Sequence, residues 1–430
     1  MNADLPIGKI GRALTSGHTA AKIGGRMLSY YTKRPFLSAD ARQQARQAAT
    51  QKSAETLFQG LSLLRGTALK MAQQLSLETD LLPESACREL AKAYHQVPPI
   101  NRALVRKVVG KALGSPPEAV FRRFDLTAFA AASLGQVHYA EDQDNQPLAV
   151  KIQYPGIAQT IAGDVSLLRQ LLWPLIQRDQ LIPTLNEVAA RLTEEVDYLK
   201  EAEQVAYFAD RLKLADVRTP MVKPHLSSST VLCTTMMPGR PLDIWLKDNP
   251  CQADRDRIAQ TLHNLFLTGL YELNLIHADP NPGNFIIGDD LTVGLVDFGC
   301  VKQLKPDFVE GCRQLAAASA HHDKDAYFRL MITLGLLPRD LAKAQMDAVR
   351  AVSDDMGDWF GRLYANEIFD FSATPDFIAD GKAILRHFHH LRQHFKMNPE
   401  FIFMDRTRYG LLRLFETMGA RVKFRNPYEW

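Results

Sequence analysis

Three oxygen-bearing side chains at a fixed spacing constrain this 430-residue chain more than any other feature. Asn284 follows Asp279 by five residues, and after a short strand–turn–strand pattern the sequence reads Asp297–Phe298–Gly299. Carboxylate and amide oxygens suit Mg²⁺, and phosphoryl transfer depends mainly on positioning and on neutralising phosphate charge. We therefore expect Asn284 and Asp297 to be metal ligands. We expect Asp279 to orient the attacking hydroxyl or water and to accept its proton.

The same spacing is that of the catalytic loop and Asp-Phe-Gly turn of protein-kinase-like folds. A lone Asp-Phe-Gly is frequent by chance, but the combined spacing is far more specific. The surrounding pattern agrees, because the segments 137–140 and 148–152 read as strands and the chain reads as mostly helical from residue 306. The predicted fold class is α+β: a two-lobed protein-kinase-like fold with an N-terminal helical extension and a mostly helical C-lobe.

A lysine that binds nucleotide phosphates is expected upstream of the catalytic loop. Lys151 stands near the end of the apolar strand pattern Leu148–Ile152, in kinase order. Its partner should be a glutamate on the following helix, where the segment 194–203 offers several candidates. For Glu194 and Glu203 a solvated acidic face is the preferred interpretation.

The loop before the lysine strand is rich in alanine where kinases carry G-x-G-x-x-G. Glycines let backbone amides approach phosphate closely, whereas alanines add methyl groups on that face. This predicts an altered nucleotide geometry and weak protein-kinase activity. The predicted nucleotide-binding set joins this loop to Lys151 and to the residues after the strand pattern 229–236: Ala130, Ala131, Ala132, Ser133, Gly135, Lys151, Met236 and Met237.

Two absences argue against an ordinary protein kinase. No Ala-Pro-Glu follows Asp297, so the peptide-docking activation segment is missing. The lysine that protein kinases carry two positions after the catalytic aspartate is also missing, and Asn281 stands in its place.

Composition narrows the class of protein further. Hydrophobic residues make up 46% and charged residues 23%, as in an average soluble protein, and no apolar run approaches the roughly 18 residues of a membrane span. The five widely spaced cysteines include no CxxC pair, which indicates a reducing compartment. No basic run is interleaved with aromatic residues, so nucleic acid is not an expected partner.

The N-terminal 52 residues concentrate positive charge. They hold nine Lys or Arg residues against two Asp, although the whole chain carries only +3. This is either a solvated helical face or a surface that attracts anionic lipid. The segment 1–35 reads as a loose amphipathic stretch with several glycines, and 40–78 reads as helix.

The predicted domains are an N-terminal helical extension over 1–117, a kinase-like N-lobe over 118–237 and a C-lobe over 238–430. Within them, 183–210 reads as one long helix and 258–273 as another. His390 and His394 have the i,i+4 spacing of a metal pair but no acidic partner pattern. Tyr428 and Trp430 end a basic tail and are expected either to pack against the extension or to act as interfacial anchors.

Taken together, these motifs resemble the UbiB/AarF family of atypical protein-kinase-like proteins, the branch tied to ubiquinone biosynthesis. The resemblance covers nearly the whole chain, and it rests on the alanine-rich loop 130–138, on Val150–Gly156 and on Asp279–Phe285. The family's Lys-x-Gly-Gln signature reads Lys70–Met71–Ala72–Gln73 here, with alanine for glycine.

The resemblance implies roles for further residues. Glu201 matches the helix partner of Lys151, and Glu195 and Asp197 match a Glu-x-Asp element that pairs with the lysine at Lys70. The helix of Lys70 and Gln73 would then lie over the active site and occlude a protein substrate.

The resemblance also implies an activity and partners. These are a Mg²⁺-dependent ATPase or small-molecule kinase acting at membranes, with ATP or ADP and Mg²⁺ as cofactors and quinone-biosynthesis enzymes as partners. Similarity that begins near Met1 leaves little room for a transit peptide and favours a cytoplasmic protein, peripheral on the inner face of the membrane and without a transmembrane helix. A homodimer remains open. The alternative function is a nucleotide-gated lipid-binding or scaffold pseudokinase with negligible turnover.

Overall fold

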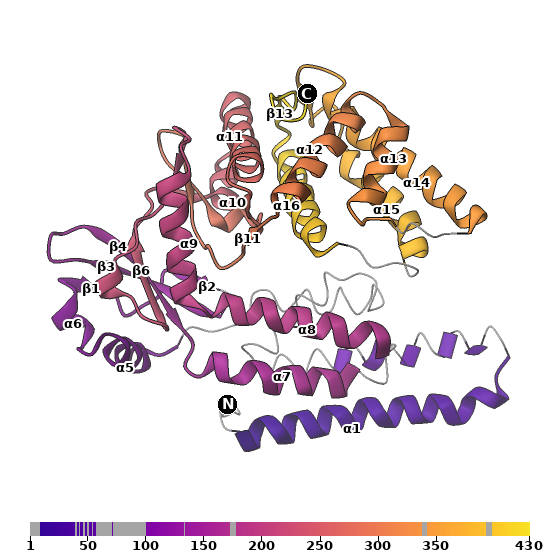
Figure 1. Cartoon of the computed structure of the whole chain (residues 1–430). Helices are drawn as coiled ribbons and strands as arrows, with labels where there is room; N and C mark the ends of the chain where they lie inside the picture. Colours follow the sequence, from indigo (N-terminus) through magenta and orange to yellow (C-terminus); the bar gives the residue numbers. More distant parts are fainter. Residues whose placement is uncertain are drawn as a thin grey trace. The chain divides into compact units, whose positions relative to one another are not determined.

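The computed structural model describes residues 9–38, 100–132, 134–172, 178–337, 342–392 and 398–430, with scattered positions between 41 and 56 and Met71. The chain divides into two compact units. The first comprises Met1–Lys200 and Lys223–Thr235, and the second comprises Glu201–Val222 and Met236–Trp430. Figure 1 follows the elements along the chain. Lys70, Gln73, Ser133 and His394 lie outside the described residues.

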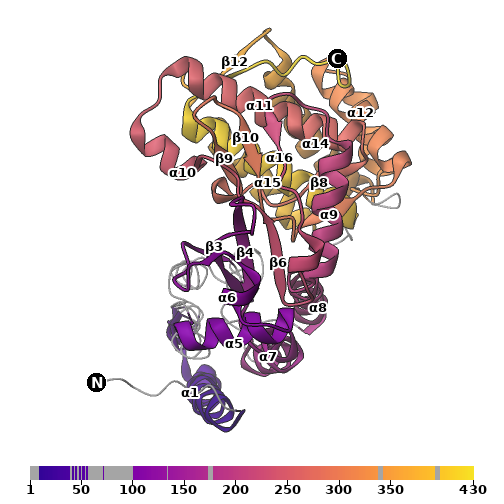
Figure 2. The ribbon, with the colours of Figure 1, turned by 90° about the vertical axis from the view of Figure 1, so that its left-hand side faces the viewer.

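An antiparallel sheet forms the core of the first unit. Its strands pair in the order β1-β3-β4-β6, and β2 also pairs with β3. Figure 2 shows β3, β4 and β6 side by side, with α5 and α6 next to them. The strands of this sheet are β1 (Arg123–Phe124), β2 (Ala130–Ala132), β3 (Gly135–Glu141), β4 (Pro147–Gln153) and β6 (Val231–Thr235).

One face of this sheet packs on α5 (Arg102–Leu113). The fully buried Val105 and Val109 of this helix meet Val150 and Ile152 of β4. Apolar residues four apart share one helix face, which explains this stripe. The other helices of the first unit are α1 (Lys9–Lys33), α6 (Pro117–Val120), α7 (Ile157–Leu172) and α8 (Arg178–Glu195), with the 3₁₀ turns η1 (Arg34–Phe36) and η3 (Pro224–Leu226).

Two expectations for this part of the chain are wrong. The segment 1–35 is not loose, because α1 runs for 25 residues through its glycines. The expected single helix over 183–210 is two helices, α8 and α9 (Tyr198–Arg211), which are separated at Val196–Asp197. The Asp197 carboxylate accepts a hydrogen bond from the backbone N–H of Lys200 (3.1 Å), so it caps the start of α9.

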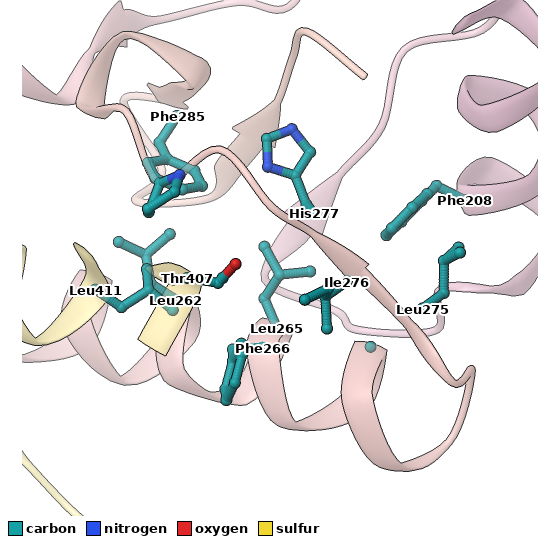
Figure 3. A pocket seen from close by; sticks show the side chains of 12 residues that line it. Phe208, Leu262, Leu265, Phe266, Leu275, Ile276, His277, Phe285, Thr407 and Leu411 are labelled. Carbon is teal, nitrogen blue, oxygen red and sulfur yellow. The ribbon is translucent and has the colours of Figure 1, made fainter. Parts of the chain in front are cut away.

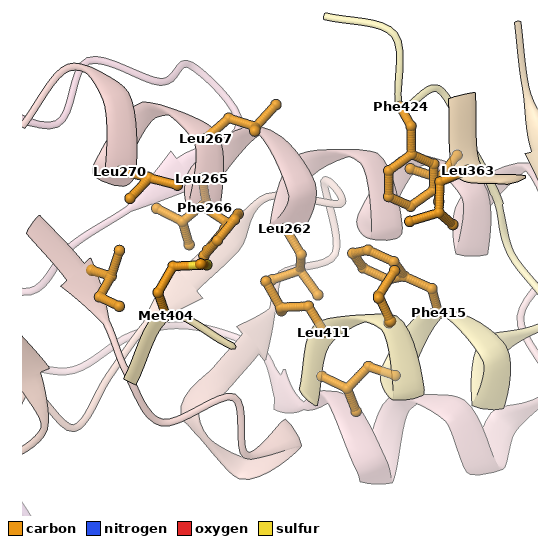
Figure 4. Packing of buried hydrophobic residues seen from close by; sticks show 14 of the residues in the cluster. Leu262, Leu265, Phe266, Leu267, Leu270, Leu363, Met404, Leu411, Phe415 and Phe424 are labelled. Atoms are coloured by element: carbon orange, nitrogen blue, oxygen red, sulfur yellow. The ribbon is translucent and has the colours of Figure 1, made fainter. Parts of the chain in front are cut away.

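The second unit is mostly helical, as expected. Its core is α11 (Gln252–Tyr271), where twelve residues are buried, packed against α16 (Pro399–Met418). Figure 4 shows Leu262 and Phe266 of α11 with Leu411 and Phe415 of α16. The other helices are α10 (Leu242–Trp245), α12 (Pro306–Ala320), α13 (Lys324–Thr333), α14 (Lys343–Gly361) and α15 (Phe377–Arg392), with the 3₁₀ turns η4 (Leu246–Asp248), η5 (Pro282–Asn284) and η6 (Arg362–Tyr364).

Short strands frame the catalytic loop of the second unit. β9 (Phe285–Ile287) and β10 (Val293–Leu295) form the expected antiparallel hairpin, flanked by β5 (Val217–Arg218) and β7 (Arg240–Pro241). The remaining strands pair as β8 (Leu275–His277) with β11 (Val301–Gln303), and β12 (Phe369–Asp370) with β13 (Arg421–Val422). No described helix has the apolar length needed to span a membrane.

The C-terminal tail packs on the core of the second unit, and its expected packing against the N-terminal extension stays a prediction. Tyr428 stacks on Tyr271 of α11, with ring centroids 5.2 Å apart. Between the two terminal aromatics, Glu429 is 1% exposed and accepts hydrogen bonds from Tyr271 (2.6 Å) and Tyr364 (2.5 Å). It also pairs with Arg408 of α16 at 2.6 Å.

Candidate active site

The catalytic loop of the second unit brings Asp279 and Asn284 into direct contact. The loop connects β8 to β9 through η5. Asn284 Nδ2 donates to Asp279 Oδ2 at 2.9 Å and to the Asp279 carbonyl at 3.2 Å. Because the amide nitrogen makes both bonds, the amide oxygen of Asn284 is the atom left to ligate a cation. Asn284 is 8% exposed, so its side chain is held in place by the fold.

Asp297 has a backbone conformation that L-residues rarely adopt. It follows β10 with φ of +60°, in the left-handed region. Its carbonyl accepts a hydrogen bond from His277 Nε2 at 2.7 Å, and its Oδ1 accepts one from the Gly299 N–H at 3.3 Å. A carbonyl can only accept, so Nε2 of His277 carries the proton. Strained backbone of this kind persists where surrounding contacts hold it, and it is concentrated at functional sites.

Phe298 anchors the turn that carries Asp297. It is 2% exposed, and its ring meets Phe208 of α9 edge-on at 5.3 Å and His277 at 5.7 Å. A small cavity of about 20 Å³ adjoins these groups, between α11, α16 and the catalytic loop. Figure 3 shows that Thr407 and Leu411 of α16 also line it. The catalytic loop therefore rests on the apolar core of the second unit.

Lys151 lies on the central strand of the first unit's sheet. It is placed opposite Val137 of β3 and Leu232 of β6. Its Nζ stands 5.2 Å from the centroid of the Tyr198 ring, in cation–π geometry. The sequence analysis expected Lys151 near the end of a strand over Leu148–Ile152, and β4 (Pro147–Gln153) carries it there.

The alanine-rich loop is a tight antiparallel hairpin. Ala130, Ala131 and Ala132 form β2, and Ala132 pairs with Gly135 of β3. A Cβ on Gly135 would come 2.3 Å from the Ile152 carbonyl oxygen and 2.9 Å from the Tyr198 hydroxyl. Only glycine permits this approach between β3 and β4.

The acidic candidates fall on two helices. Glu195 ends α8 and is half-buried, and Asp197 is exposed at the cap of α9. Glu201, in the first turn of α9, is 3% exposed, and carboxylates are buried this deeply almost only when they are paired. Met236 and Met237 directly follow β6 and are half-buried. The pairing of Lys151 with Glu201, and of the Glu195–Asp197 element with Lys70, stays a prediction.

The donor set fits a hard cation. Asn284 and Asp297 offer an amide and a carboxylate oxygen, the types that Mg²⁺ binds together with phosphate oxygens. Among the described residues there is no cluster of three or more His, Cys, Asp and Glu side chains of the kind that holds zinc. An amide and a carboxylate oxygen at this spacing are the donor types that metal-assisted phosphoryl transfer uses.

The fold and these motifs define a kinase-like protein, and comparison with known proteins identifies the family. The model of the ABC1 atypical kinase-like domain matches residues 92–331, more than half of the chain. The chain belongs to this family of atypical kinases, which confirms both the UbiB/AarF interpretation and the predicted fold class. Membership in a kinase-like family implies binding of ATP, usually with Mg²⁺.

Several of the relatives found are named as kinases. The probable serine/threonine-protein kinase abkA of Dictyostelium discoideum is 29% identical over 334 residues, covering 74% of this chain and 59% of abkA. The mitochondrial atypical kinase COQ8 of Saccharomyces cerevisiae is 29% identical over 297 residues, covering 67% of this chain and 58% of COQ8. The chain thus spans less than two thirds of the length of either relative.

A solved structure shows the same fold. A Mycobacterium tuberculosis protein solved in complex with erythromycin superposes with a TM-score of 0.61 over 89% of this chain and 96% of its own, at 22% identity. At this identity the likeness concerns the fold alone.

Sequence reasoning missed some contributors to the site. His277 was passed over, although its place two residues before Asp279 could have drawn attention to it. Helix α16 was missed because its residues meet the catalytic loop only through tertiary packing.

Proposed function

We propose that this protein is a Mg²⁺-dependent ATPase or small-molecule kinase that supports ubiquinone or lipid-quinone biosynthesis at a membrane surface. The observation that carries the proposal is the constellation of Asp279, Asn284 and Asp297, with its hydrogen bonds and the constrained Asp297 backbone. The quinone pathway comes from the family resemblance.

Each residue has a defined part in this mechanism. Asn284 and Asp297 would hold Mg²⁺, which would neutralise the phosphate oxygens when bound. Asp279 orients the attacking oxygen and accepts its proton, while Asn284 holds its carboxylate in place. Lys151 would bind phosphate oxygens, and Glu201 is its proposed helix partner. The Ala130–Ala132 hairpin, Gly135, Met236 and Met237 contribute to the nucleotide site.

A membrane role is supported by the end of α1. Leu28, Tyr31 and Phe36 are 66%, 53% and 89% exposed, close to the basic residues Lys33 and Arg34. Exposed apolar groups beside cations favour an anionic lipid surface. We propose a peripheral location on the inner face of the membrane.

The test is ATP hydrolysis by the purified chain with Mg²⁺, with and without anionic-lipid vesicles. We expect turnover that rises with vesicles and falls at least a hundredfold in Asp297→Asn, since the metal ligand is lost. Asp355→Asn on α14 is the matched control and should behave as the unmodified chain. Unchanged turnover in Asp297→Asn would refute the site assignment.

A second function is favoured by one specific observation: the hairpin carries alanines where phosphate-binding loops carry glycines. With Asn281 in place of the catalytic-loop lysine, this supports a nucleotide-gated lipid-binding or scaffold protein with negligible turnover. Nucleotide binding that alters vesicle affinity without hydrolysis would favour it. In that case Ala132→Gly should change nucleotide affinity and raise autophosphorylation, because it removes a methyl group from the hairpin.

A further inference from the structure

Asn281 stands two residues after Asp279, where protein kinases carry a lysine, and its side chain has a different role here. Asn281 Oδ1 accepts a hydrogen bond from the Gly283 N–H at 3.0 Å and so caps η5. This side chain carries no charge and serves the geometry of the turn. A catalytic carboxylate and a γ-phosphoryl group that must approach each other are both negative, so a positive charge beside the carboxylate, in addition to Mg²⁺ and Lys151, favours that approach.

Helix α16 brings such a charge to Asp279. Arg406 Nη2 lies 3.9 Å from Asp279 Oδ1, whereas the Asn284 amide bonds the other oxygen, Oδ2. The two carboxylate oxygens are therefore divided between an amide donor and a guanidinium. The side chains of Arg406 and Asp279 are 34% and 37% exposed, so a dissolved substrate can reach both.

The arginine is held at this place by the packing of its helix. One turn after it, Gly410 meets Pro280 of the catalytic loop so closely that a Cβ would come 2.2 Å from the proline Cγ. Two residues after it, Arg408 pairs with the buried Glu429 at 2.6 Å. Residues four apart share a helix face, so Arg406 and Gly410 both face the loop.

We propose that Arg406 is a positioning residue of the phosphoryl-transfer site, which replaces from α16 the cation that the catalytic loop lacks. It acts through Asp279: it orients the carboxylate and offsets its charge as the γ-phosphoryl group approaches. In the transfer step the bond from γ-phosphorus to the β-bridging oxygen breaks and a bond to the acceptor oxygen forms. The acceptor's proton passes to Asp279. This inference rests on the proposed function.

The experiment combines turnover with nucleotide binding. ATP hydrolysis is measured for the unmodified chain, Arg406→Gln, Arg406→Lys, Asp297→Asn and Arg413→Gln, an exposed arginine of the same helix. Calorimetry with Mg²⁺ then compares the affinities of ADP and of the non-hydrolysable β,γ-imido analogue of ATP. Both measurements are repeated for Arg406→Gln in an Asp279→Asn background.

We expect Arg406→Gln to lower turnover roughly ten- to a hundredfold, as loss of one charge-stabilising group does. It should also lower the preference for the ATP analogue over ADP about fivefold, because Asp279 then repels the γ-phosphate without compensation. Arg406→Lys should retain most of that preference. In the Asp279→Asn background, Arg406→Gln should leave the preference unchanged, a coupling that a merely structural role would not produce.

Other results would overturn the inference in distinguishable ways. If Asp297→Asn is inactive while Arg406→Gln keeps both turnover and preference, the proposed function stands and the role of Arg406 is wrong. If Arg406→Gln lowers the preference equally with and without Asp279, the arginine does not act through that carboxylate. If the unmodified chain binds no nucleotide, the proposed function fails and this inference fails with it. If the chain binds nucleotide but does not hydrolyse ATP, the preference for the ATP analogue over ADP still tests the role of Arg406.

Discussion

At the scale of single residues, the site depends on close approaches that only certain side chains permit. Gly135 brings β3 against β4 beside Lys151, and Gly410 brings α16 against the catalytic loop. Both lie at points where a backbone or ring fills the space that a Cβ would need. The positive φ of Asp297 is the corresponding backbone constraint.

We predict that Gly135→Ala destabilises the protein by about 2 kcal/mol, because the new methyl group would overlap the backbone carbonyl of Ile152. Denaturant unfolding measures the change. The matched control is Gly163→Ala in α7, where a Cβ meets nothing within 4 Å. This control should raise stability by about 0.5–1 kcal/mol through helix propensity. If Gly135→Ala and the unmodified chain were equally stable, the hairpin would be able to move away from Ile152 without loss of stability.

The spacing of Asp279, Asn284 and Asp297 was readable from the sequence, because turns and hairpins of a few residues leave little freedom in where their side chains go. The place of Arg406 beside Asp279 could not be predicted from the sequence. Arg406 is distant from Asp279 in the chain, and an arginine on an amphipathic helix is most often a solvated surface group.

At the scale of elements, the break between α8 and α9 separates the acidic candidates. The apolar periodicity of 183–210 continues through the break, so the pattern alone predicts one helix. In the structure α8 ends at Glu195, and α9 begins at Tyr198 with Asp197 as its N-terminal cap. Asp and Asn are preferred caps because their oxygens accept from free N–H groups of the first turn.

We predict that Asp197→Ala lowers the free energy of unfolding by about 1 kcal/mol through loss of this cap. Asp197→Asn keeps an acceptor oxygen and should change stability by only a few tenths of that. The Asn variant thus separates the cap from the charge. If Asp197→Asn alters ATP turnover while its melting temperature is unchanged, the carboxylate has the regulatory role implied by the family resemblance. If only Asp197→Ala has an effect, the residue serves the helix.

The N-terminal helix illustrates another limit. Several glycines make 1–35 a poor helix by intrinsic propensity, yet α1 spans Lys9–Lys33. Tertiary contacts override propensity here, since Ile23 is 1% exposed and α1 packs against α7.

At the scale of the whole molecule, the C-terminal tail ties distant helices of the second unit together. Burial alone would raise the pKa of Glu429, but Arg408 and the hydroxyls of Tyr271 and Tyr364 outweigh it and lower that pKa. The tail therefore places an ionised carboxylate inside the core. Removing one member of such a buried pair typically costs about 3–5 kcal/mol.

His263, beside this network on α11, makes stability depend on pH. Burial lowers its pKa to about 4, against the smaller opposing effect of Glu429. Between about pH 6.5 and 4 the unfolded chain binds a proton that the folded chain does not, so stability falls on acidification across this window. We predict a loss of up to roughly 3 kcal/mol, from the linkage between pKa and unfolding.

Unfolding of the unmodified chain and of His263→Leu at several pH values measures this effect. Leucine cannot titrate and suits the surrounding Phe415 and Phe424. Its stability should change much less between pH 6.5 and 4, apart from the loss due to Glu429 at the lowest pH. A parallel decline in both proteins would assign the acid sensitivity to other groups.

The sequence by itself determined the catalytic loop, the strand of Lys151 and the family, because these signals lie within short segments whose local geometry restricts their side chains. Tertiary structure alone decided where helix α16 and the tail lie, and therefore that Arg406 reaches Asp279 and that Glu429 is buried. Such contacts join segments far apart in the chain. They depend on how whole helices pack, and residue type and spacing in one segment carry no record of that packing.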